Sequence, residues 1–207
     1  MGYDLEAALK LCDLFNRTGQ AGMQDFSRLV HLCHYALETQ HLDGDIVEFG
    51  CFNGDTAKLL TAITSKRVYL YDSFQGLPDI GEACVPGAMT TTIEKVRLNF
   101  AADKLRQPAI HAGWFADIKP ASLPAKITLA HLDGDLYAST MQALQLVYDR
   151  VVPGGVILVD DYDEPYFEGP KRAVTEFMAN RPEPVFILQG PAGTKAFKAA
   201  IIRHGRP

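Results

Sequence analysis

Short apolar runs alternate along this chain with stretches at helical spacing, and this alternation constrains the fold more than any other feature. The apolar runs are 45–49, 68–72, 109–112, 127–133 and 155–161. The helical stretches are 55–63, 91–101, 136–149 and 170–180. Strands that alternate with helices build parallel sheets, because a helix is the usual connection between parallel strands. The pattern predicts an α/β fold with a doubly wound, mostly parallel sheet.

Both ends of the chain depart from this alternation. Runs 184–188 and 196–202 have no helix between them and predict an antiparallel hairpin at one edge of the sheet. Before residue 41, apolar side chains recur at helical spacing over 5–12 and 26–37, with Asp25 as a candidate N-cap of the second helix. At 207 residues, we expect one domain, with a helical cap over 1–41 and a catalytic core over 42–207.

Composition narrows the classes of partner. A net charge of -5 without a run of Lys or Arg disfavours nucleic acid, because little would bind a phosphate backbone. No apolar run is long enough to cross a bilayer, and the first residues lack signal-peptide features, so we expect a cytoplasmic protein that binds no membrane. The four cysteines contain no CxxC pair, which argues against a zinc site or a disulfide framework. A small-molecule substrate is therefore expected.

Acidic residues stand where four of the expected strands end: Glu48, Asp72, Asp133 and Asp160. In a doubly wound sheet the ligand lies beyond the carboxyl ends of the strands, near the point where strand order reverses. Any one of these acids could equally be a helix cap or a solvated loop residue. Four acids at corresponding positions indicate a functional site at that edge of the sheet.

The segment VEFGCFNGDT, residues 47–56, follows the first strand and predicts a ligand-binding turn. It is no Walker A loop, because its glycine spacing is one residue short and Asp55 stands where a lysine is needed. It is also no dinucleotide fingerprint, because Phe52 replaces the second glycine. A ligand with a ribose and a cation suits the acids better, since Asp72 can accept hydrogen bonds from a ribose diol. S-adenosylmethionine has both groups.

Five segments carry a resemblance to a known family: GDIVEFGCFNGDT, YDSFQGLPD, GWF, LDGDLYAST and VPGGVILVDDYD. In order and spacing they resemble the macrocin O-methyltransferases, which tailor sugars in macrolide and aminocoumarin antibiotic biosynthesis. The resemblance implies a Rossmann-like class I methyltransferase fold, S-adenosylmethionine as methyl donor and a divalent cation, usually Mg²⁺. It also implies a small acceptor with hydroxyl groups. The chain is shorter than the family pattern before the first strand and after GLP, so the acceptor stays open.

These motifs indicate which residues bind the methyl donor and the metal. The expected donor-binding residues are Glu48, Phe49, Gly50, Asn53, Gly54, Thr56, Asp72, Ser73, Gly113, Trp114 and Asp133. Trp114 either stacks on the adenine or anchors the core. The expected metal ligands are Asp133, Asp160 and Asp161, because carboxylate oxygens without Cys or His suit Mg²⁺.

Three residues are candidates for the proton acceptor: Asp133, Asp135 and His131. Asp133 is preferred because the family gives its matching aspartate both metal and base roles. A carboxylate on a metal is less basic than other carboxylates, so the other two stay open. A histidine inside the apolar run ITLAHL is more often a packed core residue.

Two other functions use the same kind of sheet. A nicotinamide-dependent oxidoreductase would need a glycine in place of Phe52 and a proton relay that the sequence does not offer. A non-catalytic binding module would be indicated by a lost acid or a broken glycine loop, and neither is found. A homodimer is possible on the sequence alone.

Overall fold

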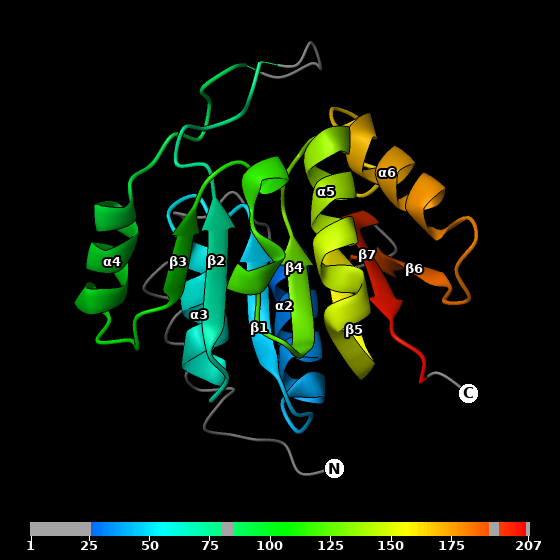
Figure 1. Cartoon of the computed structure of the whole chain (residues 1–207), viewed down its shortest axis with the longest axis horizontal. Coiled ribbons are helices and arrows are strands. Elements are labelled where there is room, and N and C mark those ends of the chain that lie inside the picture. The colour runs from blue at the N-terminus through cyan, green and yellow to red at the C-terminus, as the bar shows by residue number, and fades with distance from the viewer. Residues whose placement is uncertain (1–25, 80–84, 191–194, 206–207) are drawn as a thin grey trace.

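Seven strands form one sheet in the computed structural model, which describes residues 26–79, 85–190 and 195–205 (Figure 1). The strands are β1 (Asp45–Phe49), β2 (Val68–Asp72), β3 (Ala109–Ala112), β4 (Ile127–Leu132), β5 (Val151–Val159), β6 (Val185–Gln189) and β7 (Lys195–Ile202). Their order is β3-β2-β1-β4-β5-β7-β6, and only β7 runs antiparallel to its neighbours. The predicted parallel sheet and its antiparallel hairpin at one edge are both confirmed.

Helices cover both faces of the sheet (Figure 1). One face packs against α2 (Phe26–Thr39), α3 (Asp55–Ile63) and α4 (Ile93–Ala102). The other face packs against α5 (Tyr137–Val147) and α6 (Glu168–Met178). Three short 3₁₀ turns, 115–117, 120–122 and 148–150, complete the regular structure. No helix among the described residues is long and apolar enough to span a membrane.

The strands are apolar on both faces because each face has its own core. Ile46 of β1 lies in the core under α2 and α3, whereas the next residue, Val47, lies in the core under α5. The same alternation of side chains applies to Leu129 and Ala130 of β4, as the two-residue period of a strand requires. Near the carboxyl ends of the strands, polar side chains replace apolar ones on the α2 face.

The expected start of β5 was wrong by four residues. The apolar run predicts that the strand begins at residue 155, but the strand begins at Val151 and contains the Pro-Gly-Gly segment 153–155. Ile127 pairs with Val151 and Leu129 with Val156, so β5 makes a local irregularity that takes up the additional residues. Gly154 has a φ of 80° there, a left-handed conformation that glycine adopts without strain. The expected helix over 5–12 and the cap at Asp25 lie outside the described residues.

Candidate functional site

A cavity of about 460 Å³ opens at the carboxyl ends of β1, β2, β4 and β5. Of the expected site residues, those lining it are Gly50, Asn53, Thr56, Asp72, Ser73, Trp114, Asp133, Asp135 and Asp161. Those that lie behind its wall are Glu48, Phe49, Gly54, Gly113, His131 and Asp160. The structure therefore brings the loop after β1, residues 50–54 (the glycine loop), and the aspartates that follow β4 and β5 (the acid cluster) to one cavity.

Asp72 fixes the loop after β1. Its Oδ2 accepts hydrogen bonds from the main-chain N–H groups of Cys51, at 2.9 Å, and Phe52, at 3.1 Å. Its Oδ1 accepts from the N–H of Phe74 at 2.7 Å. Carboxylate–amide bonds of this kind are among the stronger hydrogen bonds in proteins. The loop is thus attached to the end of β2 by one side chain.

Glycine is required at position 50 because the ends of β1 and β4 meet there. Gly50 has a φ of 85°, and a Cβ on it would lie 1.8 Å from the main-chain oxygen of Asp133. No side chain fits at that distance. Gly54, with a φ of 82°, is the N-cap of α3 and packs against Val96 and Phe100 of α4.

Polar side chains of the loop are used to hold its shape. The Asn53 side-chain oxygen accepts from the Thr91 hydroxyl at 3.0 Å, and its main-chain oxygen accepts from Asn99 at 2.9 Å. The Ser73 hydroxyl accepts from the N–H of Gln75 and donates to the carbonyl of Gly76. These bonds connect the loop to α4 and close the turn after β2.

Aromatic side chains lie below and beside this loop. Phe49 is buried and stacks on Tyr71, with ring centroids 4.6 Å apart. Phe115 meets Phe49 edge-on at 5.1 Å and lines the cavity together with Trp114. Trp114 is partly exposed to the cavity, and Gly113, with a φ of 150°, precedes it. Trp114 was expected at the site from the sequence, whereas Phe115 was not.

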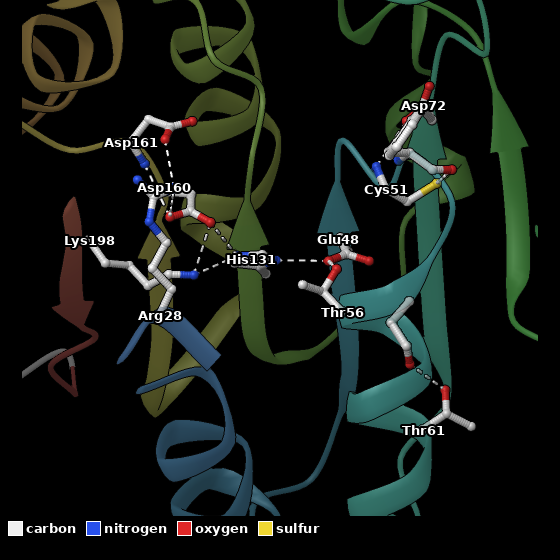
Figure 2. A network of polar contacts seen from close by, with 12 residues as sticks. Arg28, Glu48, Cys51, Thr56, Thr61, Asp72, His131, Asp160, Asp161 and Lys198 are labelled. Atoms are coloured by element: carbon white, nitrogen blue, oxygen red, sulfur yellow. Dashed lines mark hydrogen bonds and ion pairs between the residues drawn. The ribbon is translucent and has the colours of Figure 1, made fainter. Parts of the chain in front are cut away.

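A row of buried polar side chains crosses the sheet behind the cavity (Figure 2). Glu48 on β1, His131 on β4, Asp160 after β5 and Lys198 on β7 are almost completely buried. His131 Nδ1 lies 2.8 Å from Glu48 Oε1, and its Nε2 lies 3.1 Å from Lys198 Nζ. Lys198 Nζ also donates to Asp160 Oδ2 at 3.0 Å. The row links the glycine loop to the acids after β5.

The contacts in this row indicate which ring nitrogen of His131 carries the hydrogen. A lysine ammonium can only donate, so His131 Nε2 accepts from Lys198 and the ring hydrogen is on Nδ1. That N–H donates to Glu48, which also accepts from the Thr56 hydroxyl. Both ring nitrogens are therefore occupied inside the protein. The other Glu48 oxygen, Oε2, is buried and has no hydrogen-bond partner in the described part of the chain.

Four aspartates form the acid cluster: Asp133, Asp135, Asp160 and Asp161. Carboxylate oxygens of Asp133, Asp135 and Asp161 lie within 4.8 Å of one another, and a second grouping joins His131, Asp133 and Asp160. Burial and the neighbouring acids raise the pKa of Asp133 well above its ordinary value. Burial and a hydrogen bond with Asp161 do the same for Asp135.

Asp160 has the opposite shift because cations surround it. Burial by itself raises the pKa of this carboxyl, but the Lys198 ammonium and the Arg28 guanidinium outweigh burial. The pKa is held well below its ordinary value. Asp160 is therefore ionised at neutral pH, next to acids that resist ionisation.

Arg28 of α2 contacts three acids from the cavity side. Its Nη1 lies 2.8 Å from Asp161 Oδ1 and 3.3 Å from Asp160 Oδ1, and its Nη2 lies 3.1 Å from Glu164 Oε2. No local pattern in the sequence indicates this contact, since Arg28 and Asp160 are 132 residues apart. Lys198 was also missed, although a lysine inside the apolar run AFKAAII is itself a sign of a buried ion pair.

Comparisons with known proteins agree with this architecture. The family model described as Macrocin-O-methyltransferase (TylF) matches residues 15–185. A tetracenomycin rhamnosyl 4'-O-methyltransferase of Streptomyces olivaceus is 33% identical over 162 residues, which are 68% of this chain and 62% of that protein. Demethyldecarbamoylnovobiocin O-methyltransferase of Streptomyces niveus is 33% identical over 141 residues, 59% of this chain and 54% of that protein.

Similarity to a solved structure identifies the class of the fold. The O-methyltransferase NovP superposes with a TM-score of 0.74 at 27% identity, covering 86% of this chain and 80% of NovP. The sheet is therefore the Rossmann-like sheet of class I methyltransferases, with the strand order described above. The chain spans less than two thirds of the length of the two Streptomyces enzymes.

Proposed function

Because the chain belongs to the macrocin O-methyltransferase family, we propose that it transfers a methyl group from S-adenosylmethionine to a hydroxyl of a small molecule. The observation that carries this proposal is one cavity lined on one side by the glycine loop and on the other by the acid cluster. The name of the Streptomyces olivaceus relative, with its rhamnosyl group, points to a sugar-bearing natural product as acceptor. A sugar or another diol-bearing natural product is the acceptor that we propose here.

The donor side fits S-adenosylmethionine, whose sulfonium makes its methyl group electrophilic. Glu48 lies just behind the wall, its Oε2 has no hydrogen-bond partner among the described residues, and its negative charge favours a cationic ligand in the cavity. Asp72 uses Oδ1 for only one of the hydrogen bonds described, and a carboxylate oxygen can accept a second one, from a ribose hydroxyl. We assign donor contact to Gly50, Asn53, Thr56, Asp72, Ser73, Trp114 and Asp133. Phe49, Gly54 and Gly113 support that wall from behind.

The acid side fits a divalent cation. Carboxylate oxygens of Asp133, Asp135 and Asp161 lie within 4.8 Å of one another, and hard oxygen ligands suit Mg²⁺. Asp160 is grouped with Asp133 and His131. The raised pKa values of Asp133 and Asp135 indicate a surplus of negative charge that a cation would relieve. We assign Asp133, Asp160 and Asp161 to this cation. Once bound, a dication would lower the pKa of an acceptor hydroxyl and orient it.

The cavity leaves two candidates to take the proton of the acceptor hydroxyl. His131 is unsuited, because Glu48 and Lys198 occupy its two ring nitrogens behind the wall. Asp133 belongs to both groupings of possible metal ligands, whereas Asp135 belongs to one. We therefore assign Asp135 as the proton acceptor, because a carboxylate whose pKa is raised is more basic than an ordinary one.

Donor binding and turnover test the proposal separately. Calorimetry should detect S-adenosylmethionine binding with and without chelator, and labelled donor should methylate a member of a diol panel only when a divalent cation is present. Asp135→Asn should lower the rate and keep the metal affinity, whereas Asp133→Asn should lower both. A fully chelated sample that remains active, with metal loss checked by elemental analysis, would contradict the metal mechanism. Absence of donor binding would contradict the methyltransferase assignment itself.

A further inference from the structure

We propose that Arg28 is a built-in counter-cation of the acid cluster and competes with a divalent cation for Asp160 and Asp161. This inference rests on the proposed metal site, and it concerns a residue that lies outside the sequence motifs. It predicts that α2, through one side chain, sets the metal affinity of the protein.

The contacts of Arg28 are with the carboxylate oxygens that a metal would need. Its guanidinium donates to Oδ1 of Asp161 and lies near Oδ1 of Asp160. Both residues are expected metal ligands, and Arg28 lines the same cavity as Asp161. The Arg28 side chain is only 11% exposed, so its charge interacts with the acids with little screening by water. Two cations cannot share these oxygens at full strength.

Lys198 provides the contrast within the same cluster. It donates to the other oxygen of Asp160, Oδ2, from the side of the sheet where His131 lies (Figure 2). Lys198 is fully buried and is not part of the cavity wall. A cation that enters from the cavity therefore meets the oxygen held by Arg28 and leaves Lys198 in place.

Arg28 has a third acidic partner that allows it to give up the first two. Its Nη2 donates to Glu164 Oε2 at 3.1 Å, and its guanidinium carbon lies 5.5 Å from the centre of the Phe197 ring. Glu164 belongs to the segment between β5 and α6 and also lines the cavity. The guanidinium can thus keep Glu164 while a metal takes Asp160 and Asp161.

Metal affinity of the purified protein tests this inference without any acceptor. Arg28→Met keeps a long apolar side chain and removes the charge, so Mn²⁺ and Mg²⁺ should bind about tenfold more tightly by calorimetry. Arg97→Met, the same change on the exposed surface of α4, should leave the affinity unaltered. Arg28→Lys keeps the charge and should stay closer to wild type than Arg28→Met does.

The outcomes separate the inference from the proposed function. Metal binding in wild type that is equal or weaker in Arg28→Met overturns the role of Arg28 and leaves the metal site intact. No binding in either protein overturns both. Arg28→Gln replaces Arg28→Met if the latter does not fold. The Tm of each variant is also measured with and without Mn²⁺. If Mn²⁺ raises the Tm of Arg28→Met by no more than it raises that of wild type, Arg28 does not compete with the metal.

Discussion

The two halves of the cavity wall hold their acids by different means. On the donor half, made by the ends of β1 and β2, Asp72 is held by three main-chain N–H groups. On the acid half, made by the ends of β4 and β5, Asp160 and Asp161 are held by the charged side chains of Arg28 and Lys198. Neutral amides thus bind the acid of the donor half, whereas charged side chains neutralise the acids of the acid half.

The two halves should therefore differ in their sensitivity to substitution. Of all substitutions only proline removes a main-chain donor, so the donor half depends mostly on its glycines and on Asp72 itself. Charged side chains can be removed one at a time, and each removal leaves a buried partner without its counter-ion. The acid half should therefore be more sensitive to charge, pH and bound cations.

The largest expected effect is on the acid half. Lys198→Met leaves Asp160 buried without its ammonium partner and should lower the free energy of unfolding by about 3–5 kcal/mol. Urea denaturation measures the loss. The matched control is Lys126→Met, whose ion pair with Asp43 is exposed to water and should contribute little to stability. Equal losses in the two variants would mean that charge does not hold the acid half.

A smaller effect is expected when the donor half loses its central acid. Asp72→Ala leaves the N–H groups of Cys51 and Phe52 without their acceptor, and S-adenosylmethionine binding should weaken by about 1.5–3 kcal/mol. Calorimetry with donor and, separately, with Mn²⁺ should show that metal affinity is unchanged. If the variant lost metal affinity as well, the two halves would not be independent.

The pH dependence of stability should come from the acid half. Folding raises the pKa values of Asp133 and Asp135, which are about 3.9 in the unfolded chain. At a pH above the unfolded value, the folded metal-free protein therefore keeps protons on these carboxyls that the unfolded chain has lost. Their contribution to stability is complete below about pH 4 and is lost as pH rises through the folded pKa values.

The control for this prediction is a neutral pair. In chelator, Asp133→Asn with Asp135→Asn should be more stable than wild type at neutral pH, and the advantage should shrink as pH falls. Urea denaturation at a series of pH values measures the difference. A constant difference between the two proteins would show that these carboxyls keep ordinary pKa values in the folded state.

The smallest expected effect concerns two buried thiols. Burial raises the pKa of Cys33 to about 12, and burial with the charges of Asp72 and Glu48 raises that of Cys51 well above its ordinary value. Neither thiol should be alkylated by iodoacetamide in the native protein at pH 8, because the thiolate is the reactive form. In Asp72→Ala, Cys51 should react faster while Cys33 stays protected, as peptide mass spectrometry can show. Faster reaction of both would indicate general unfolding.

Most of the fold followed from local patterns. The expected bounds of β1, β2, β3 and α3 agree with the structure to the residue, because apolar runs bounded by polar turns are visible in the sequence. The start of β5 could not be placed, since Pro153 and the two glycines after it look like a turn and only pairing with β4 makes them part of a strand.

The site was predicted where its residues lie at strand ends. Asp72, Asp133, Asp135 and Asp161 all line the cavity, as expected from parallel strands that end at one edge. The counter-ions were not predicted, because the sequence does not show which distant side chain neutralises a buried acid. Asp160 and Lys198 meet only through the pairing of β5 with β7.

The position of Lys198 on β7 has a consequence for how the chain is made. During synthesis the ribosome completes β4 and β5 well before β7, and Lys198 follows Asp160 by 38 residues. At an elongation rate of about 5–20 residues per second, Asp160 waits roughly two to eight seconds for its partner. Until then Asp160 has Arg28 but lacks the buried ammonium of Lys198, so we expect the half of the sheet that carries it to close after the donor half.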